Sequence, residues 1–118
     1  MSKSRRPTME HMPAICVVVV GGPDGLVEAV RRSIGKIAIA RIVPTDVAGA
    51  ATQVASARPF AIVISEEIYG FDADEFDALA RDVQAAIITI QTDGVTARSL
   101  QDKLDPRILE AYRKRFGS

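Results

Sequence analysis

The sequence contains little that could build a disulfide, a histidine-based catalytic centre or an aromatic core. Among its 118 residues there are one cysteine, one histidine and no tryptophan, with four phenylalanines and two tyrosines. A single cysteine excludes an internal disulfide and any metal site made of several cysteines. Because Cys16 lies in an apolar run, we expect a buried, unreactive thiol. The scarcity of aromatics predicts a core of Val, Ile, Leu and Ala.

Long apolar runs and a net charge are also lacking. Fifteen basic residues balance fifteen acidic ones, which argues against nucleic acid or an acidic membrane as a partner. The apolar runs are far shorter than the ~20 residues of a membrane span, and the basic N-terminus is not followed by a convincing signal-peptide core. We therefore expect a cytoplasmic protein. Its abundance of Ala, Arg, Asp and Val suits a bacterium with a GC-rich genome.

The first thirteen residues differ from the rest of the chain. Residues 1–13 are polar, carry two prolines and show no periodicity, which predicts a flexible arm before a single domain over residues 14–118. His11 lies in this arm without an orienting partner, so we expect no catalytic or metal-binding role for it. The basic run Lys3–Arg6 is too short to indicate specific nucleic-acid binding.

Apolar runs and amphipathic stretches alternate through the domain. The order predicts a parallel α/β sheet of about four strands with helices on both faces, a flavodoxin-like fold in which C-terminal helices replace a fifth strand. Strands are predicted at 15–20, 37–43, 60–65 and 86–91, and helices at 25–34, 46–57, 73–83, 95–105 and 106–116.

Prolines, glycines and capping residues predict where these elements end. Pro44 is expected to end the second strand, and Gly35 to close the first helix in the left-handed conformation. Asp105 and Pro106 together predict a break between two C-terminal helices. Thr45 or Asp46 is expected to cap the second helix. The predicted inner face of that second helix consists of Val47, Ala50, Ala51 and Val54.

The third helix has the clearest predicted start. Asp72 is a suitable N-cap, and Glu75 three residues later completes a variant of the capping box. Phe71 and Phe76 occupy the two positions of a hydrophobic staple, which predicts that their rings pack together.

Ligands of parallel sheets bind beyond the carboxyl ends of the strands. We therefore look for a functional site among residues 21–24, 44–46, 65–67 and 91–93. The candidate partner-binding residues at this edge are Asp24, Glu66, Glu67, Gln91 and Thr92.

No residue at this edge predicts catalysis or a cofactor. In the turn Gly21–Gly25, Pro23 has no N–H and Asp24 is negative where a phosphate would sit, so we expect a structural turn. Ser65 has no histidine to act as a base. Glu66 and Glu67 are consecutive, need not share a face and have no clear third carboxylate, so we expect neither a metal site nor acid–base chemistry.

One segment suggests a family. The stretch 55–66, Ala-Ser-Ala-Arg-Pro-Phe-Ala-Ile-Val-Ile-Ser-Glu, resembles the passage from the second helix to the third strand of response-regulator receiver domains. In that family the strand ends in the aspartate that accepts a phosphoryl group, and Glu66 stands at that position here. The resemblance extends over about residues 15–92, mainly through topology.

The departures from receivers indicate a degenerate member, a pseudo-receiver. Gly21 and Gly22 replace the acidic pair that holds Mg²⁺, and Gln91, with Thr92 beside it, stands where Thr or Ser is expected. The fifth strand with its lysine has no counterpart, so phosphoryl transfer lacks both its nucleophile and its charge neutralisation. The resemblance implies a non-catalytic regulatory module that binds another protein, with Glu66 imitating a phosphorylated aspartate.

Two other functions stay open. Residues 22–24 and 64–68, together with a terminal helix over 106–116, resemble the small stalk subunit of archaeal-type rotary ATPases, in which that helix binds a partner. A small nucleotide- or phosphate-binding enzyme that uses the glycine-rich turn is the third hypothesis. Stabilisation of the protein by nucleotides would distinguish this enzyme hypothesis from the pseudo-receiver and stalk-subunit hypotheses, which predict no nucleotide binding.

The C-terminal helix and the uneven charges complete the sequence-based expectations. Tyr112 and Phe116 lie on an apolar stripe beside a basic helix end, which suits either docking on a partner or packing on the sheet. Without a fifth strand, one edge of the sheet is uncovered, and we predict homodimerisation through this helix or through that open edge.

The charges are distributed unevenly along the chain. From Glu66 to Asp82 seven acids accompany one base, a pattern more typical of a solvated face than of a binding site.

Overall fold

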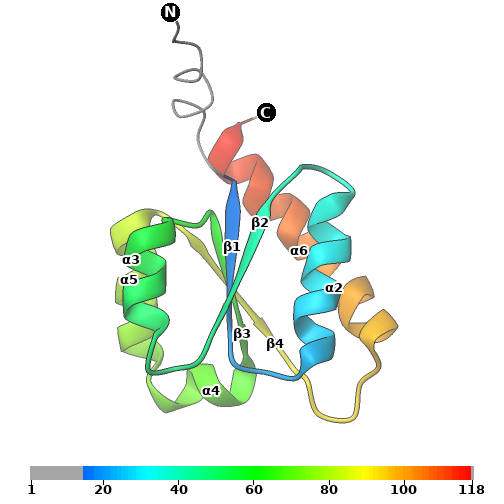
Figure 1. The fold of residues 1–118 in the computed structure, drawn as a ribbon, viewed down its shortest axis with the longest axis horizontal. Helices are drawn as coiled ribbons and strands as arrows, with labels where there is room; N and C mark the ends of the chain where they lie inside the picture. The colour runs from blue at the N-terminus through cyan, green and yellow to red at the C-terminus, as the bar shows by residue number, and fades with distance from the viewer. Residues whose placement is uncertain (1–14, 118) are drawn as a thin grey trace, which may run out of the picture.

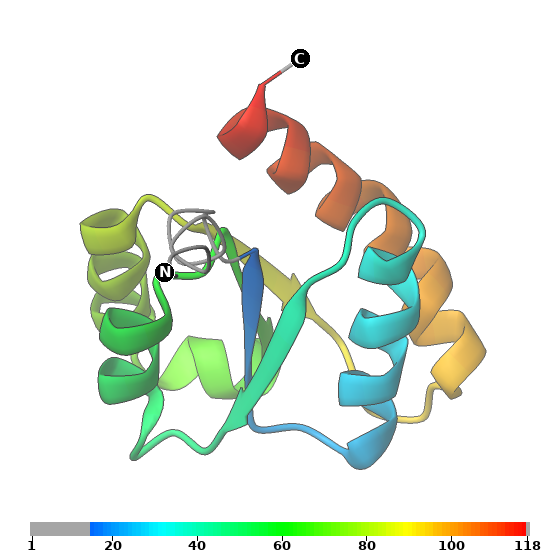
Figure 2. The same cartoon turned by 45° about the horizontal axis from the view of Figure 1, so that its top comes forward.

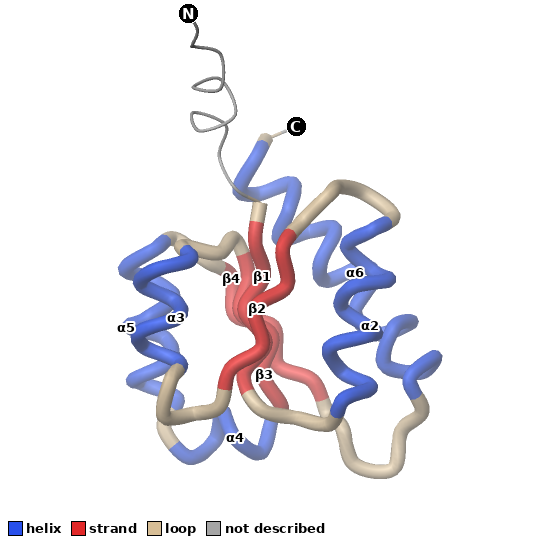
Figure 3. The backbone as a smooth tube through the Cα atoms, in the orientation of Figure 1, coloured by secondary structure: helices blue, strands red, loops and turns tan. Residues whose placement is uncertain are grey.

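The computed structural model describes residues 15–117 and confirms the α/β fold (Figures 1 and 3). Four parallel strands form one sheet in the order β2-β1-β3-β4, the flavodoxin-like order without its fifth strand in the described part of the chain. The strands are β1 (Cys16–Val20), β2 (Arg41–Thr45), β3 (Ala61–Ser65) and β4 (Ala86–Ile90). The helices are α2 (Asp24–Gly35), α3 (Ala50–Ala57), α4 (Glu66–Phe71), α5 (Ala73–Val83) and α6 (Ala97–Phe116). The predicted arm over residues 1–13, with His11, lies outside the described residues.

Each face of the sheet has its own apolar core. Val17 and Val19 of β1 pack with residues of α2 and α6, whereas Val18 and Val20 face α3 and α5. Figure 2 shows the two helix pairs on opposite sides of the sheet. All residues of the central strands β1 and β3 are buried, and each buried Val, Leu or Ile contributes roughly 1.5–3 kcal/mol. Cys16 is buried, as expected, and burial raises the pKa of its thiol.

The second strand differs from its prediction. It spans Arg41–Thr45 rather than residues 37–43, and it continues through Pro44 instead of ending there. Arg41 donates its N–H to Ile15, and the Thr45 carbonyl accepts from Gly21, so the backbone of Pro44 faces away from β1. A proline is tolerated at this place because an edge strand needs no N–H on its outer side.

Two predicted helix ends are also wrong. Gly35 stays helical and Lys36 forms the C-cap with a right-handed conformation, so no left-handed glycine closes α2. The helix α3 begins at Ala50, after a turn in which Asp46 Oδ1 accepts a hydrogen bond from the Gly49 N–H at 2.8 Å. Asp46 therefore caps the turn rather than the helix, and Ala51 is exposed as a result.

The segment between β3 and α5 contains a helix that the sequence did not predict. The short helix α4 spans Glu66–Phe71 and lies at the carboxyl end of the sheet (Figure 1). Asp72 precedes α5 without a side-chain capping bond. Phe71 is 86% exposed while Phe76 is buried, so neither the capping box nor the hydrophobic staple forms. The reason is that the backbone of residues 66–71 is already helical and directs Phe71 outward.

The C-terminal region forms one helix rather than two. α6 continues through Pro106, although proline removes one intrahelical hydrogen bond. Leu104 and Ile108 on either side of Pro106 are both fully buried in the same core, and this shared packing outweighs the lost bond. Asp105 does not cap a helix; its Oδ2 accepts from Lys36 Nζ at 2.6 Å. Within residues 15–117, no helix is both long and apolar enough to cross a membrane.

Candidate functional site

The carboxyl end of the sheet brings the predicted polar residues together. A depression of about 300 Å³ lies between the ends of β3 and β4. Its lining consists of Ser65, Glu66, Glu67, Gln91, Thr92 and Asp93. Four of the five edge residues proposed from the sequence therefore share one site. Glu66 and Glu67 both line it because they begin a helix and do not alternate between the faces of a strand.

The exception is Asp24, which does not line this depression. It begins α2 and is exposed. Its negative charge interacts favourably with the positive end of the helix dipole. The structure therefore gives Asp24 a local role in α2 and separates it from Glu66 and Glu67.

Ser65 is held by its position at the start of α4. The residue is buried, and its Oγ accepts a hydrogen bond from the Ile68 N–H at 3.3 Å. This bond satisfies one of the free donors in the first turn of the helix. The side chain of Ser65 thus caps the start of α4, the helix to which Glu66 and Glu67 belong.

The glycine-rich turn is packed beneath the same helix. Gly21 has a φ of +63°, and its N–H donates to the Thr45 carbonyl at 2.8 Å. A Cβ at this position would clash with the end of the Ile68 side chain. The backbone conformation of the turn favours glycine, and a larger residue at position 21 would displace the end of the Ile68 side chain. One N–H that could have met a phosphate is already bonded.

A second hollow, more apolar, lies next to α4. It has a volume of about 470 Å³ and lies between α3, α4 and α5. We call it the Phe71 groove; its lining is Val47, Ala50, Ala51, Ile68, Phe71, Asp72, Glu75, Phe76 and Leu79. Phe71 is 86% exposed and Val47 53% exposed. The sequence pattern assigned Phe71 to a hydrophobic staple and so did not predict this groove. The one signal for it is the apolar group Ile68, Tyr69 and Phe71 within an acidic stretch.

The Phe71 groove belongs to an acidic stretch of the chain, and Asp72 and Glu75 of that stretch line it. Seven acids lie between Glu66 and Asp82, and none of them belongs to an ion pair within the described residues, where Glu28 and Asp105 are the paired acids. Asp77 accepts a hydrogen bond from the Tyr69 hydroxyl at 2.7 Å, which raises the pKa of Tyr69. The groove thus combines a mainly apolar lining with the carboxylates of Asp72 and Glu75.

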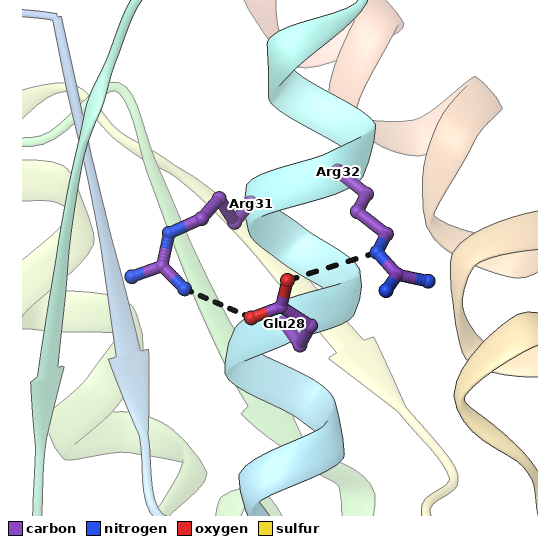
Figure 4. Close-up of polar contacts among 3 residues, drawn as sticks. All are labelled: Glu28, Arg31 and Arg32. Carbon is purple, nitrogen blue, oxygen red and sulfur yellow. Dashed lines mark hydrogen bonds and ion pairs between the residues drawn. The ribbon is translucent and has the colours of Figure 1, made fainter.

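The paired charges are elsewhere on the molecule. Figure 4 shows Glu28 of α2 between Arg31, at 3.1 Å, and Arg32, at 3.7 Å. These side chains are exposed, so each pair contributes well under about 1 kcal/mol. They lie on α2, outside the acidic stretch at residues 66–82.

Tyr112 and Phe116 lie away from the carboxyl edge. Both rings pack against Phe60, which precedes β3 at the amino end of the sheet, with centroids 5.7 and 5.8 Å away. Phe116 remains 39% exposed. The C-terminal helix packs over one face of the sheet beside α2 and does not fill the fifth-strand position; docking of Tyr112 and Phe116 on a partner stays a prediction.

Within residues 15–117, no group of three or more His, Cys, Asp or Glu side chains is arranged to hold a metal ion. Comparisons of the chain with protein-family models, with curated proteins and with solved structures find no match. The resemblance to receiver domains therefore remains a prediction from residues 55–66 and from the topology.

Proposed function

We propose that this domain is a non-catalytic protein-binding module of the pseudo-receiver kind. The observation that carries the proposal is Phe71, a large apolar side chain 86% exposed beside an apolar groove. Exposed aromatic residues beside a concave apolar surface are typical of protein interfaces. Catalysis has less support, because the Ser65 hydroxyl is engaged in helix capping.

The charges around the groove define the chemistry of the partner. Asp72 and Glu75 line the groove itself, and Glu66 and Glu67 lie at the other end of α4. A complementary partner presents apolar anchors flanked by lysine or arginine, for example on one face of an amphipathic helix. The apolar anchors provide affinity, and the basic residues orient the partner and speed its association.

Glu66 connects this surface with the receiver hypothesis. It follows β3 directly, at the position of the phosphoryl-accepting aspartate in receivers, and it is exposed in the carboxyl-edge depression. A permanent carboxylate there supports a module that binds its partner without phosphorylation. Because α4 joins Glu66 to Phe71, one partner can contact both residues.

Affinity capture from the cells that make the protein tests this proposal. Phe71→Ser removes the apolar anchor, and Glu66→Ala removes the carboxylate. Ile39→Ser is the matched control, because Ile39 is 98% exposed and does not line the groove. We expect a partner that is retained by the wild type and by Ile39→Ser but lost or strongly reduced with Phe71→Ser and Glu66→Ala.

Two results contradict the proposal. One is a set of captured proteins that is identical for all four forms of the domain. The other is recovery of rotary-ATPase components independently of Phe71 and Glu66, which favours the rotary-ATPase stalk hypothesis instead.

A further inference from the structure

The two edges of the sheet are built differently. On the β2 edge, the contacts of Arg41 and Thr45 with the β1 side place the backbone of Ile42 and Pro44 on the outer side. Pro44 has no N–H, so this edge lacks one of the donors that an added strand needs. β2 therefore carries a standard protection against edge-to-edge pairing.

The β4 edge has no such protection. The N–H of Ala86 donates to the Phe60 carbonyl at 2.9 Å, so Ala86, Ile88 and Ile90 face β3 and the backbones of Ile87 and Thr89 face outward. The one outer partner that the described residues supply is the Arg107 guanidinium, which donates to the Thr89 carbonyl. Within residues 15–117, both polar groups of Ile87 and the N–H of Thr89 have no hydrogen-bond partner on this outer side, so another chain can bond to them.

A groove follows this edge between β4 and α6. One depression, of about 350 Å³, includes Thr89 and Ile90 from the strand. The next, of about 140 Å³, includes Ile87 and Ile88, and Arg107 of α6 lines both. In a flavodoxin-like sheet the fifth strand pairs with β4 here. The position is therefore shaped for a strand that residues 15–117 do not supply.

Basic side chains from α6 line the groove. Lys103, Arg107 and Lys114 are exposed and take part in no ion pair within the described residues, whereas the acids in the lining are Glu66 and Glu110. Two copies paired through β4 would bring two rows of bases together, and the residues 1–13 are themselves basic. An acidic segment therefore complements the basic lining of the groove better than a second copy of β4 or residues 1–13 would.

We propose that the outer edge of β4 binds an extended acidic segment of another protein, which adds to the sheet as a fifth strand. The main chain of the segment bonds to Ile87 and Thr89, and its carboxylates face Lys103, Arg107 and Lys114. Main-chain bonds give affinity in this mode of recognition, and side-chain contacts give specificity. This edge is separate from the Phe71 groove, so the inference goes beyond the proposed function.

Peptide titration of the full ¹⁵N-labelled chain tests the inference. The probe is a capped eight-residue peptide in which Glu alternates with Val, and its control has Lys in place of Glu. We expect the Glu peptide at millimolar concentration to shift the amide signals of Ile87 and Thr89 more than that of Val43 in β2. Added salt weakens this binding, and the Lys peptide gives no comparable shift.

Variants assign the binding to the edge. Thr89→Pro removes an outward N–H and is expected to lower the affinity for the Glu peptide by up to about tenfold. Thr89→Val keeps the N–H and is expected to bind the peptide as the wild type does. The exposed double variant Lys103→Glu, Lys114→Glu tests the charge if Thr89→Pro does not fold. Phe71→Ser leaves binding of the Glu peptide unchanged, which separates this inference from the proposed function.

Any of four results overturns the inference. The Lys peptide binds as well as the Glu peptide, the shifts occur at the Phe71 groove, or no shift occurs at β4. The fourth result is a change of the Ile87 and Thr89 signals when the protein is diluted without peptide, because such a change shows that a second copy of the chain occupies the edge.

Discussion

The ring of Phe60 lies edge-on to the ring of Tyr112, with centroids 5.7 Å apart and planes at 83°. This contact joins the residue before β3 to the last turns of α6, and Phe116 packs on both rings. The three aromatic rings close the amino end of the sheet. Tyr112 and Phe116 therefore contribute to the packing of α6, and their docking on a partner stays a prediction.

We predict that Tyr112→Ala lowers the free energy of unfolding by about 2–3 kcal/mol, because it removes buried ring area and an edge-to-face pair. Phe116→Ala costs less, about 1 kcal/mol, because its ring is partly exposed. Urea unfolding followed by circular dichroism measures both. Equal stability of Tyr112→Ala and the wild type would show that the C-terminal turns of α6 are not part of the core.

The ion pair between Lys36 and Asp105 predicts a dependence of stability on pH. Burial raises the pKa of the Asp105 carboxyl, but the hydrogen bond from Lys36, the neighbouring Ser33 hydroxyl and the charge of Lys36 together outweigh this, and the pKa lies below its usual value. A carboxyl with a lowered folded-state pKa stabilises the fold above its unfolded pKa of about 3.9, and the stabilisation is lost as the pH falls through the folded pKa.

Asp105→Asn is therefore expected to lower the free energy of unfolding by up to about 1 kcal/mol at pH 6, since Lys36 is largely exposed. The difference from the wild type shrinks as the pH falls below 4. Lys36→Gln, the control, loses the same stabilisation at pH 6. A difference that stays constant with pH would assign the effect to packing rather than to the ion pair.

Two glycines predict opposite effects of the same substitution. Gly21→Ala is expected to cost about 1–3 kcal/mol, because a φ of +63° strains alanine and the new methyl group meets Ile68. Gly35→Ala is expected to stabilise by up to about 1 kcal/mol, because the site is helical and open. Thermal unfolding compares the two variants. A neutral Gly21→Ala would contradict the packing of α4 on this turn.

ATP, GTP and common dinucleotides are predicted not to raise the melting temperature. The N–H of Gly21 is bonded to Thr45, Pro23 has no N–H, and Asp24 places a carboxylate at the start of α2. A ligand at 100 times its Kd would stabilise the fold by about 2.7 kcal/mol, which is easily seen by differential scanning fluorimetry. A clear shift would support the hypothesis of a nucleotide-binding enzyme instead.

The apolar pattern was sufficient to predict the sheet and its topology. The continuous apolar runs at 15–20 and 60–65 predicted two of the strands, and all residues of the corresponding β1 and β3 are buried, as is typical of strands covered on both faces. The edge strand β2 was placed too early because Pro44 was taken as a strand end. Proline excludes a central strand but not the outer side of an edge strand.

The candidate site was predicted in part. The rule that parallel strands end at one edge correctly brought Glu66, Glu67, Gln91 and Thr92 together. The Phe71 groove was missed because α4 has only six residues, too few for the apolar periodicity that identifies a helix in the sequence. The β4 groove also needed the structure, since the periodicity of α6 does not tell which strand edge its basic residues line.

Photo-crosslinking at position 71 tests the central claim most directly. A photoreactive phenylalanine analogue replaces Phe71 in one form of the protein and Ile39 in another, and both are irradiated in the cells that make the protein. We predict a discrete crosslinked species from position 71 that is absent from position 39 and is reduced when Glu66 is also changed to Ala. No adduct at position 71, or the same adducts from both positions, would contradict a docking site at the Phe71 groove.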